Sequence, residues 1–172
     1  MLDKIKRNYK EFPNPFKVLV LATFIDRFGG FLLFPFFSFY LMDRFGVGGT
    51  QVGILFTMWA AGSIIGSMIG GALADKYGRR SMVLLGLISS GTGSILMGLV
   101  DNLFLFLMIA GLLGILGDIG GPARQAMVVD LLPSERRSGG FGLLRVAVNV
   151  SATIGPILGG FLATKSYLSL FI

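Results

Sequence analysis

The chain has 172 residues, of which 53% are hydrophobic and only 14% are charged, and its mean hydropathy is +0.79. A soluble domain carries roughly 25% charged residues, so this balance excludes an ordinary soluble protein and indicates an integral membrane protein. The chain has no cysteine and no histidine, which excludes disulfides, thiolate chemistry and imidazole metal ligands. We therefore expect no metal site and no cofactor, and any proton carrier must be a carboxylate.

The net charge of +6 does not indicate a nucleic-acid surface, because the basic residues gather at the ends of apolar runs. Clusters of lysine and arginine precede the first run, follow the second and surround the end of the fourth. Only Arg44 and Lys165 fall in the alternate loops. The positive-inside rule therefore places residues 1–17 in the cytoplasm and predicts a multi-pass protein of the inner, cytoplasmic membrane, with the lipid bilayer as a partner and no nucleic acid.

The first apolar run covers residues 18–42, which exceeds the roughly 20 residues that span a bilayer, and Pro35 predicts a kink in it. Further spans are expected at 52–74, 81–100, 103–129 and 138–163. The predicted fold class is thus an all-α, polytopic membrane protein with five complete transmembrane helices. A sixth run at 167–172 reaches only about 9 Å of helix, so we expect a missing C-terminal half or a partner subunit to complete the bundle.

Residues 71–80 place four charges and a turn glycine between the second and third apolar runs. A membrane helix must end where water begins, so we expect residues 75–80 to form a cytoplasmic turn.

Small residues recur along three of the expected spans, at Gly62, Gly66 and Gly70, at Gly111, Gly114, Gly117 and Gly120, and at Ser151, Gly155 and Gly159. Lipid gives helices no hydrophobic drive to associate, so these smooth stripes predict close helix packing. Pro156, between Gly155 and Gly160, removes a helical hydrogen bond. The fifth span therefore carries either a static kink or a hinge.

Charged and polar residues lie at membrane depth, at Asp26, Arg27, Asp118, Arg145 and Asn149. Asp26 and Arg27 fall about 13 Å into the first span, and Arg145 and Asn149 share one helix face. Such groups are functional candidates by default.

Two interpretations of these groups stay open. An aspartate and an arginine can form a static pair, or an aspartate can exchange a proton, because burial favours the neutral carboxyl and a nearby arginine favours the ionised one. Arg124 lies close to the end of its span, where we expect it to reach the interface.

Two motifs carry a resemblance to a known family. Residues 71–80 resemble motif A of the major facilitator superfamily, and residues 155–160 resemble motif C of its antiporters, with Ser151 in place of the leading glycine. The chain thus resembles the N-terminal half of a drug–proton antiporter of that family. The arginine of motif B is absent from residues 103–117, which leaves Arg145 or Arg27 as its substitute.

The resemblance implies a conformational gate formed by Gly71, Asp75, Gly78, Arg79, Arg80 and Asp130. In it, Asp75 would cap a helix of the C-terminal half and Arg79 would pair with Asp130. It also implies proton-coupled efflux of a small organic molecule by alternating access, with Asp26 as the first proton candidate. The alternative is a truncated, non-transporting membrane fragment or a helical partner subunit. An enzyme is not expected, because the chain has no phosphate-binding loop and no histidine or cysteine.

Overall fold

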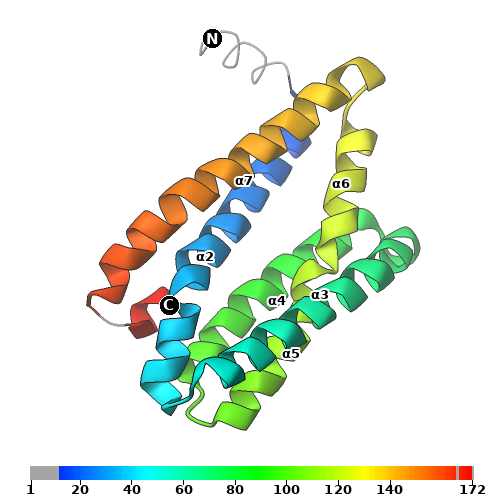
Figure 1. Cartoon of the computed structure of the whole chain (residues 1–172). Coiled ribbons are helices and arrows are strands. Elements are labelled where there is room, and N and C mark those ends of the chain that lie inside the picture. Colours follow the sequence, from blue (N-terminus) through cyan, green and yellow to red (C-terminus); the bar gives the residue numbers. More distant parts are fainter. Residues whose placement is uncertain (1–11, 166, 172) are drawn as a thin grey trace.

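The computed structural model describes residues 12–165 and 167–171, and all regular structure in these residues is helical (Figure 1). The elements are α2 (Asn14–Phe45), α3 (Gly49–Tyr77), α4 (Arg79–Leu99), α5 (Leu103–Asp118), α6 (Gly120–Leu131), α7 (Ser134–Ala163) and a short 3₁₀ helix, η1 (Tyr167–Leu170). Five helical segments are long and apolar enough to cross a membrane, with α5 and α6 together forming one of them. The all-α fold class is confirmed.

The charged turn between the second and third spans is shorter than predicted. Gly78 alone separates α3 from α4, so Asp75 lies in the last turn of α3 and Arg79 is the first residue of α4. Gly78 has φ 91° and ψ 138°, a conformation that residues with a Cβ rarely adopt. The prediction of a turn over 75–80 was therefore too wide, because one glycine is enough to reverse the chain here.

The fourth span is broken, whereas the sequence predicted one continuous helix. The helix stops at Asp118, Ile119 forms a turn, and α6 begins at Gly120. Pro122 explains the position of the break, because proline has no N–H to donate to the carbonyl of Asp118 four residues earlier. In contrast, α2 and α7 continue as single helices past Pro35 and Pro156.

The glycines of the predicted stripes lie at close helix contacts, except for Gly117, where a Cβ would meet nothing within 4 Å. A Cβ on Gly62 would lie 2.7 Å from the carbonyl oxygen of Gly111, and one on Gly66 would meet the backbone of Ile115, so α3 and α5 pack backbone to backbone. On the other side of the molecule α2 lies along α7, where a Cβ on Gly155 would lie 2.9 Å from Phe31 (Figure 1). Close approach at these stripes gains van der Waals contact that larger side chains would prevent.

Two apolar clusters occupy opposite ends of the bundle. The first contains the start of α2 and the end of α3, with Phe16 and Ala74 among its buried members. The second contains the end of α2 and the start of α3, with Leu41 and Leu55. Asp26 of α2 and Ser63 of α3 lie between the two clusters along their helices.

Candidate functional site

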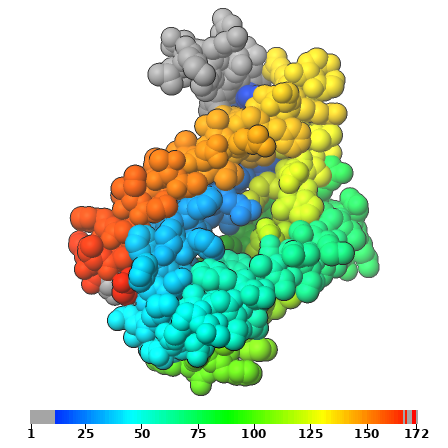
Figure 2. All heavy atoms as spheres, viewed as in Figure 1, coloured from blue at the N-terminus to red at the C-terminus, as the bar shows by residue number. Residues whose placement is uncertain are grey.

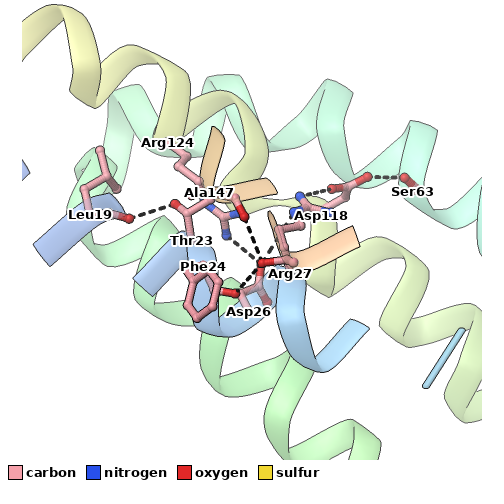
Figure 3. Close-up of polar contacts among 10 residues, drawn as sticks. Leu19, Thr23, Phe24, Asp26, Arg27, Ser63, Asp118, Arg124 and Ala147 are labelled. Atoms are coloured by element: carbon pink, nitrogen blue, oxygen red, sulfur yellow. Dashed lines mark hydrogen bonds and ion pairs between the residues drawn. The ribbon is translucent and has the colours of Figure 1, made fainter. Parts of the chain in front are cut away.

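A network of charged side chains crosses the middle of the bundle (Figure 3). Arg124 of α6 donates a hydrogen bond from Nη2 to Oδ2 of Asp26 in α2, at 3.1 Å. The Nε of Arg27 lies 3.8 Å from the same carboxylate oxygen. The side chains of Asp26 and Arg124 are only 12% and 7% exposed, so Asp26 is a buried carboxylate held by two arginines.

Arg27 connects this pair to a second carboxylate. Its Nη2 lies 3.7 Å from Oδ1 of Asp118, at the end of α5, and the hydroxyl of Ser63 in α3 donates to the other oxygen of Asp118. Two arginines and two aspartates thus form one electrically balanced chain across α2, α3, α5 and α6. A pair of Asp118 with Arg27 was among the static pairs that the sequence suggested.

The sequence-based prediction for Arg124 was wrong. Its side chain does not reach the interface but is buried against α2, where it pairs with a residue 98 positions earlier in the chain. Ile119, at the junction of α5 and α6, has φ −58° and ψ −31°, and Arg124 lies on the part of α6 that faces Asp26 of α2. The arginine that neutralises Asp26 is therefore neither Arg145 nor a residue of motif B. The sequence held one indication that an arginine would be buried, because a carboxylate at the depth of Asp26 requires a positively charged partner.

Ser151 forms a second polar link, between α2 and α7. It is fully buried, and its hydroxyl lies 3.1 Å from the carbonyl oxygen of Phe24 and 2.9 Å from that of Ala147. A glycine at this position would lack the hydroxyl. The serine that replaces the leading glycine of motif C thus keeps the close packing and adds a hydrogen bond between helices.

A cavity of about 690 Å³ lies beside the charged network, between α2, α3, α5, α6 and α7. The space-filling view shows a hollow where α2, α3 and α6 meet (Figure 2). The ionisable residues in its lining are Arg27, Asp118, Arg124 and Arg145. Asp26 does not line the cavity, and neither does Asn149, whose exposed side chain lies one turn further along α7 than Arg145.

A separate set of polar contacts lies at the end of the bundle near Gly78. Arg79 forms an ion pair with Asp130 and donates to the carbonyl oxygen of Ala126 at 3.2 Å, which ties the start of α4 to the end of α6. Arg137, which the sequence did not single out, donates to the carbonyl oxygens of Val129 and Leu132, both at 3.2 Å. Asp75 and Arg80 are exposed, and neither forms an ion pair within 12–165 and 167–171.

Five apolar spans, with a charged network at mid-depth and a cavity beside it, define a multi-pass helical membrane protein. The chain belongs to the Major Facilitator Superfamily, whose sequence profile matches residues 19–172.

Several named proteins are similar to this chain in sequence. The chain is 28% identical over 158 residues to a Na(+), Li(+), K(+)/H(+) antiporter of Planococcus maritimus, which covers 89% of this chain and 37% of the relative. It is 28% identical to the quinolone resistance protein NorA of Staphylococcus aureus (87% and 38%) and 34% identical to the multidrug resistance protein MdtG of Dickeya zeae (77% and 33%). The chain thus spans little more than a third of the length of these relatives.

Proposed function

We propose that this chain forms the N-terminal part of a proton-coupled secondary transporter, which exports a small organic molecule by alternating access. The observation that carries the proposal is the position of Asp118, which lines the cavity and is joined through Arg27 to the buried Asp26–Arg124 pair. The names of the relatives, which include an antiporter for H(+) and two resistance proteins, also support a proton-coupled exporter. Transporters built from repeats bind substrate between them, so a further half or partner subunit would close the cavity.

Asp118 is a better proton carrier than Asp26, the first candidate from the sequence. The side chain of Asp118 is 35% exposed and borders the cavity, whereas that of Asp26 is 12% exposed and held by two arginines. A group that exchanges protons needs a path to water. Asp26 then serves as the fixed counter-charge that keeps Arg124 and Arg27 in place.

Several charged and polar groups face Asp118 from the helices around it. They are Arg27 from α2, the Ser63 hydroxyl from α3, Arg124 from α6 and Arg145 across the cavity from α7; α4 contributes charged residues only at its first two positions. Protonation of Asp118 would remove a counter-charge from Arg27 and leave it attached to Asp26 alone. Asp118 also lies at the junction of α5 and α6, and interrupted helices are where transporters of this kind form their substrate and ion sites.

We propose that the contacts near Gly78 form the conformational gate. The Arg79–Asp130 pair holds the start of α4 to the end of α6, and Asp75, exposed at the end of α3, is free to meet the N-terminus of a helix in another half. Gly78 permits the tight turn that brings these charges together. On this proposal the gate lies on the cytoplasmic side, with the N-terminus also cytoplasmic, in the inner membrane of a bacterium.

The proton role is tested by substituting Asp118→Asn in the natural protein that carries this chain. Reconstituted in proteoliposomes, the variant should lose the acceleration of substrate transport by an imposed pH gradient while keeping exchange of substrate without a gradient. Asp101→Asn is the matched control, because Asp101 lies in an exposed loop outside the network. If the Asp118→Asn variant keeps gradient-driven transport, Asp118 is not the proton carrier.

The proposed orientation has its own test. Because the chain has no cysteine, single cysteines can be introduced at Thr50 and Ser134, which lie at opposite ends of the bundle. An impermeant maleimide added to intact cells should label position 50 and spare position 134. The reverse pattern would place the N-terminus outside.

A further inference from the structure

We infer that the substrate is an amphiphilic organic anion, with one carboxylate on an apolar body, and that Arg145 binds the carboxylate. The inference rests on the transport function proposed above and names the class of substrate that the cavity takes.

The charges around the cavity do not balance. Among the residues that the structure describes, three arginines line it, Arg27, Arg124 and Arg145, together with one acid, Asp118. Adding Asp26, which lies behind Arg124, gives three positive charges and two negative ones. The ion pairs account for Arg27 and Arg124, so the uncompensated positive charge belongs to Arg145.

Arg145 lies too deep for its charge to be incidental. It is eleven residues from the first residue of α7, which places it about 16 Å along the helix, near the middle of a bilayer. Its side chain is exposed to the cavity and has no ion pair in the part of the chain that the structure describes. Charges at this depth either pair with a protein group or line a substrate path. Because Arg145 borders the cavity and has no such pair among the described residues, we assign it to a substrate path.

The cavity lining also holds guanidinium groups whose hydrogen-bond donors are not all used within the described residues. Nε of Arg124 is buried and finds no acceptor among residues 12–165 and 167–171, and one oxygen of Asp118 is already taken by Ser63. The guanidinium of Arg145 adds its own free donors. A carboxylate supplies acceptors and no donor, and its two oxygens match the planar fork of an arginine. A cationic substrate would instead face the unpaired positive charge.

The remaining lining residues describe the rest of the ligand. Phe141 and Val148 flank Arg145 at four residues before and three after, so they lie on the same face of α7, and Leu144 and Pro122 extend this apolar wall. A ring system can rest on this wall while its carboxylate reaches Arg145. The cavity volume of about 690 Å³ is ample for a two-ring aromatic acid.

The inference is tested by equilibrium binding to the natural protein that carries this chain, purified in detergent, with no gradient. The probes are radiolabelled naphthalene-2-carboxylate and naphthalene-2-carboxamide, which share a ring system and differ in charge. We expect the carboxylate to bind at least tenfold more tightly than the amide. Arg145→Gln should remove this preference without weakening the amide, and Arg145→Lys should retain part of it. Lys165→Gln, which removes a positive charge beyond the end of α7, should leave both affinities unchanged.

Failure of the carboxylate to bind, equal affinity for the two ligands, or a preference that survives in Arg145→Gln would each overturn the inference. A helical circular dichroism spectrum equal to that of the natural protein verifies that each variant is folded. This binding experiment tests the substrate class independently of proton coupling, because binding at equilibrium needs no pH gradient. A protein that binds the carboxylate but ignores the gradient would overturn the coupling alone.

Discussion

The charged groups of this protein fall into two settings that differ in burial. At mid-depth, Asp26 and Arg124 are almost fully buried, and each carboxylate has more than one partner. At the ends of the bundle, the Arg79–Asp130 and Arg44–Asp101 pairs have side chains between 34% and 79% exposed. Water can replace either partner of the pairs at the ends, but it has little access to the Asp26–Arg124 pair. The same pairing of arginine with aspartate should therefore have very different energetic weight in the two settings.

The largest effect is expected from Arg124→Met, which leaves Asp26 buried without its closest cation. Removing one partner of a buried pair typically costs about 3–5 kcal/mol of unfolding free energy, because the remaining charge is uncompensated. The measurement is unfolding in mixed detergent, followed by far-ultraviolet circular dichroism. The double variant Asp26→Asn with Arg124→Met should recover most of the loss. A single variant as stable as the natural protein would mean that the pair does not hold the helices.

The next largest effect is expected at Gly66, where the backbone of α3 meets Ile115 of α5. Gly66→Ala should destabilise the protein by about 1–3 kcal/mol, because the added methyl group forces two backbones apart. Trp59 is the only tryptophan and packs against Gly114 on the same interface, so its fluorescence reports the separation. Gly71→Ala is the matched control, since a Cβ there meets nothing within 4 Å. Equal effects of the two substitutions would contradict a packing role for the stripe.

The difference between the two settings also explains what could be predicted from sequence. The spans lie within four residues of their predicted bounds, because apolar length and glycine spacing are local properties of a helix. The burial of Arg124 could not be predicted, because it depends on the packing of α6 against Asp26, which lies 98 residues earlier in the chain. The break itself had a local signal in Pro122. The order of Asp118 and Asp26 as proton candidates depends on which of them borders the cavity, and only the assembled helices determine that.

A smaller effect on stability is expected from Arg79→Gln, although its effect on transport should be large. The pair with Asp130 is partly exposed, so its loss should change the unfolding free energy by no more than about 1 kcal/mol. If the pair holds one conformation of the gate, however, the rate of transport should fall while equilibrium substrate binding stays the same. The measurement is initial transport rate in proteoliposomes alongside binding in detergent. A variant that loses stability by several kcal/mol and keeps its transport rate would make Arg79 structural.

The smallest effect is expected from Arg44→Gln, at the opposite end of the bundle. Arg44, in the last turn of α2, pairs with Asp101 in the loop between α4 and α5, and the aspartate side chain is 79% exposed. The substitution should change the unfolding free energy by less than about 0.5 kcal/mol, and this difference should vanish at 1 M salt, where the screening length falls to about 3 Å. The loss in Arg124→Met should persist at the same salt concentration, because ions do not reach the middle of the bundle. A salt-dependent loss at Arg124, or a salt-resistant one at Arg44, would remove the distinction between the two settings.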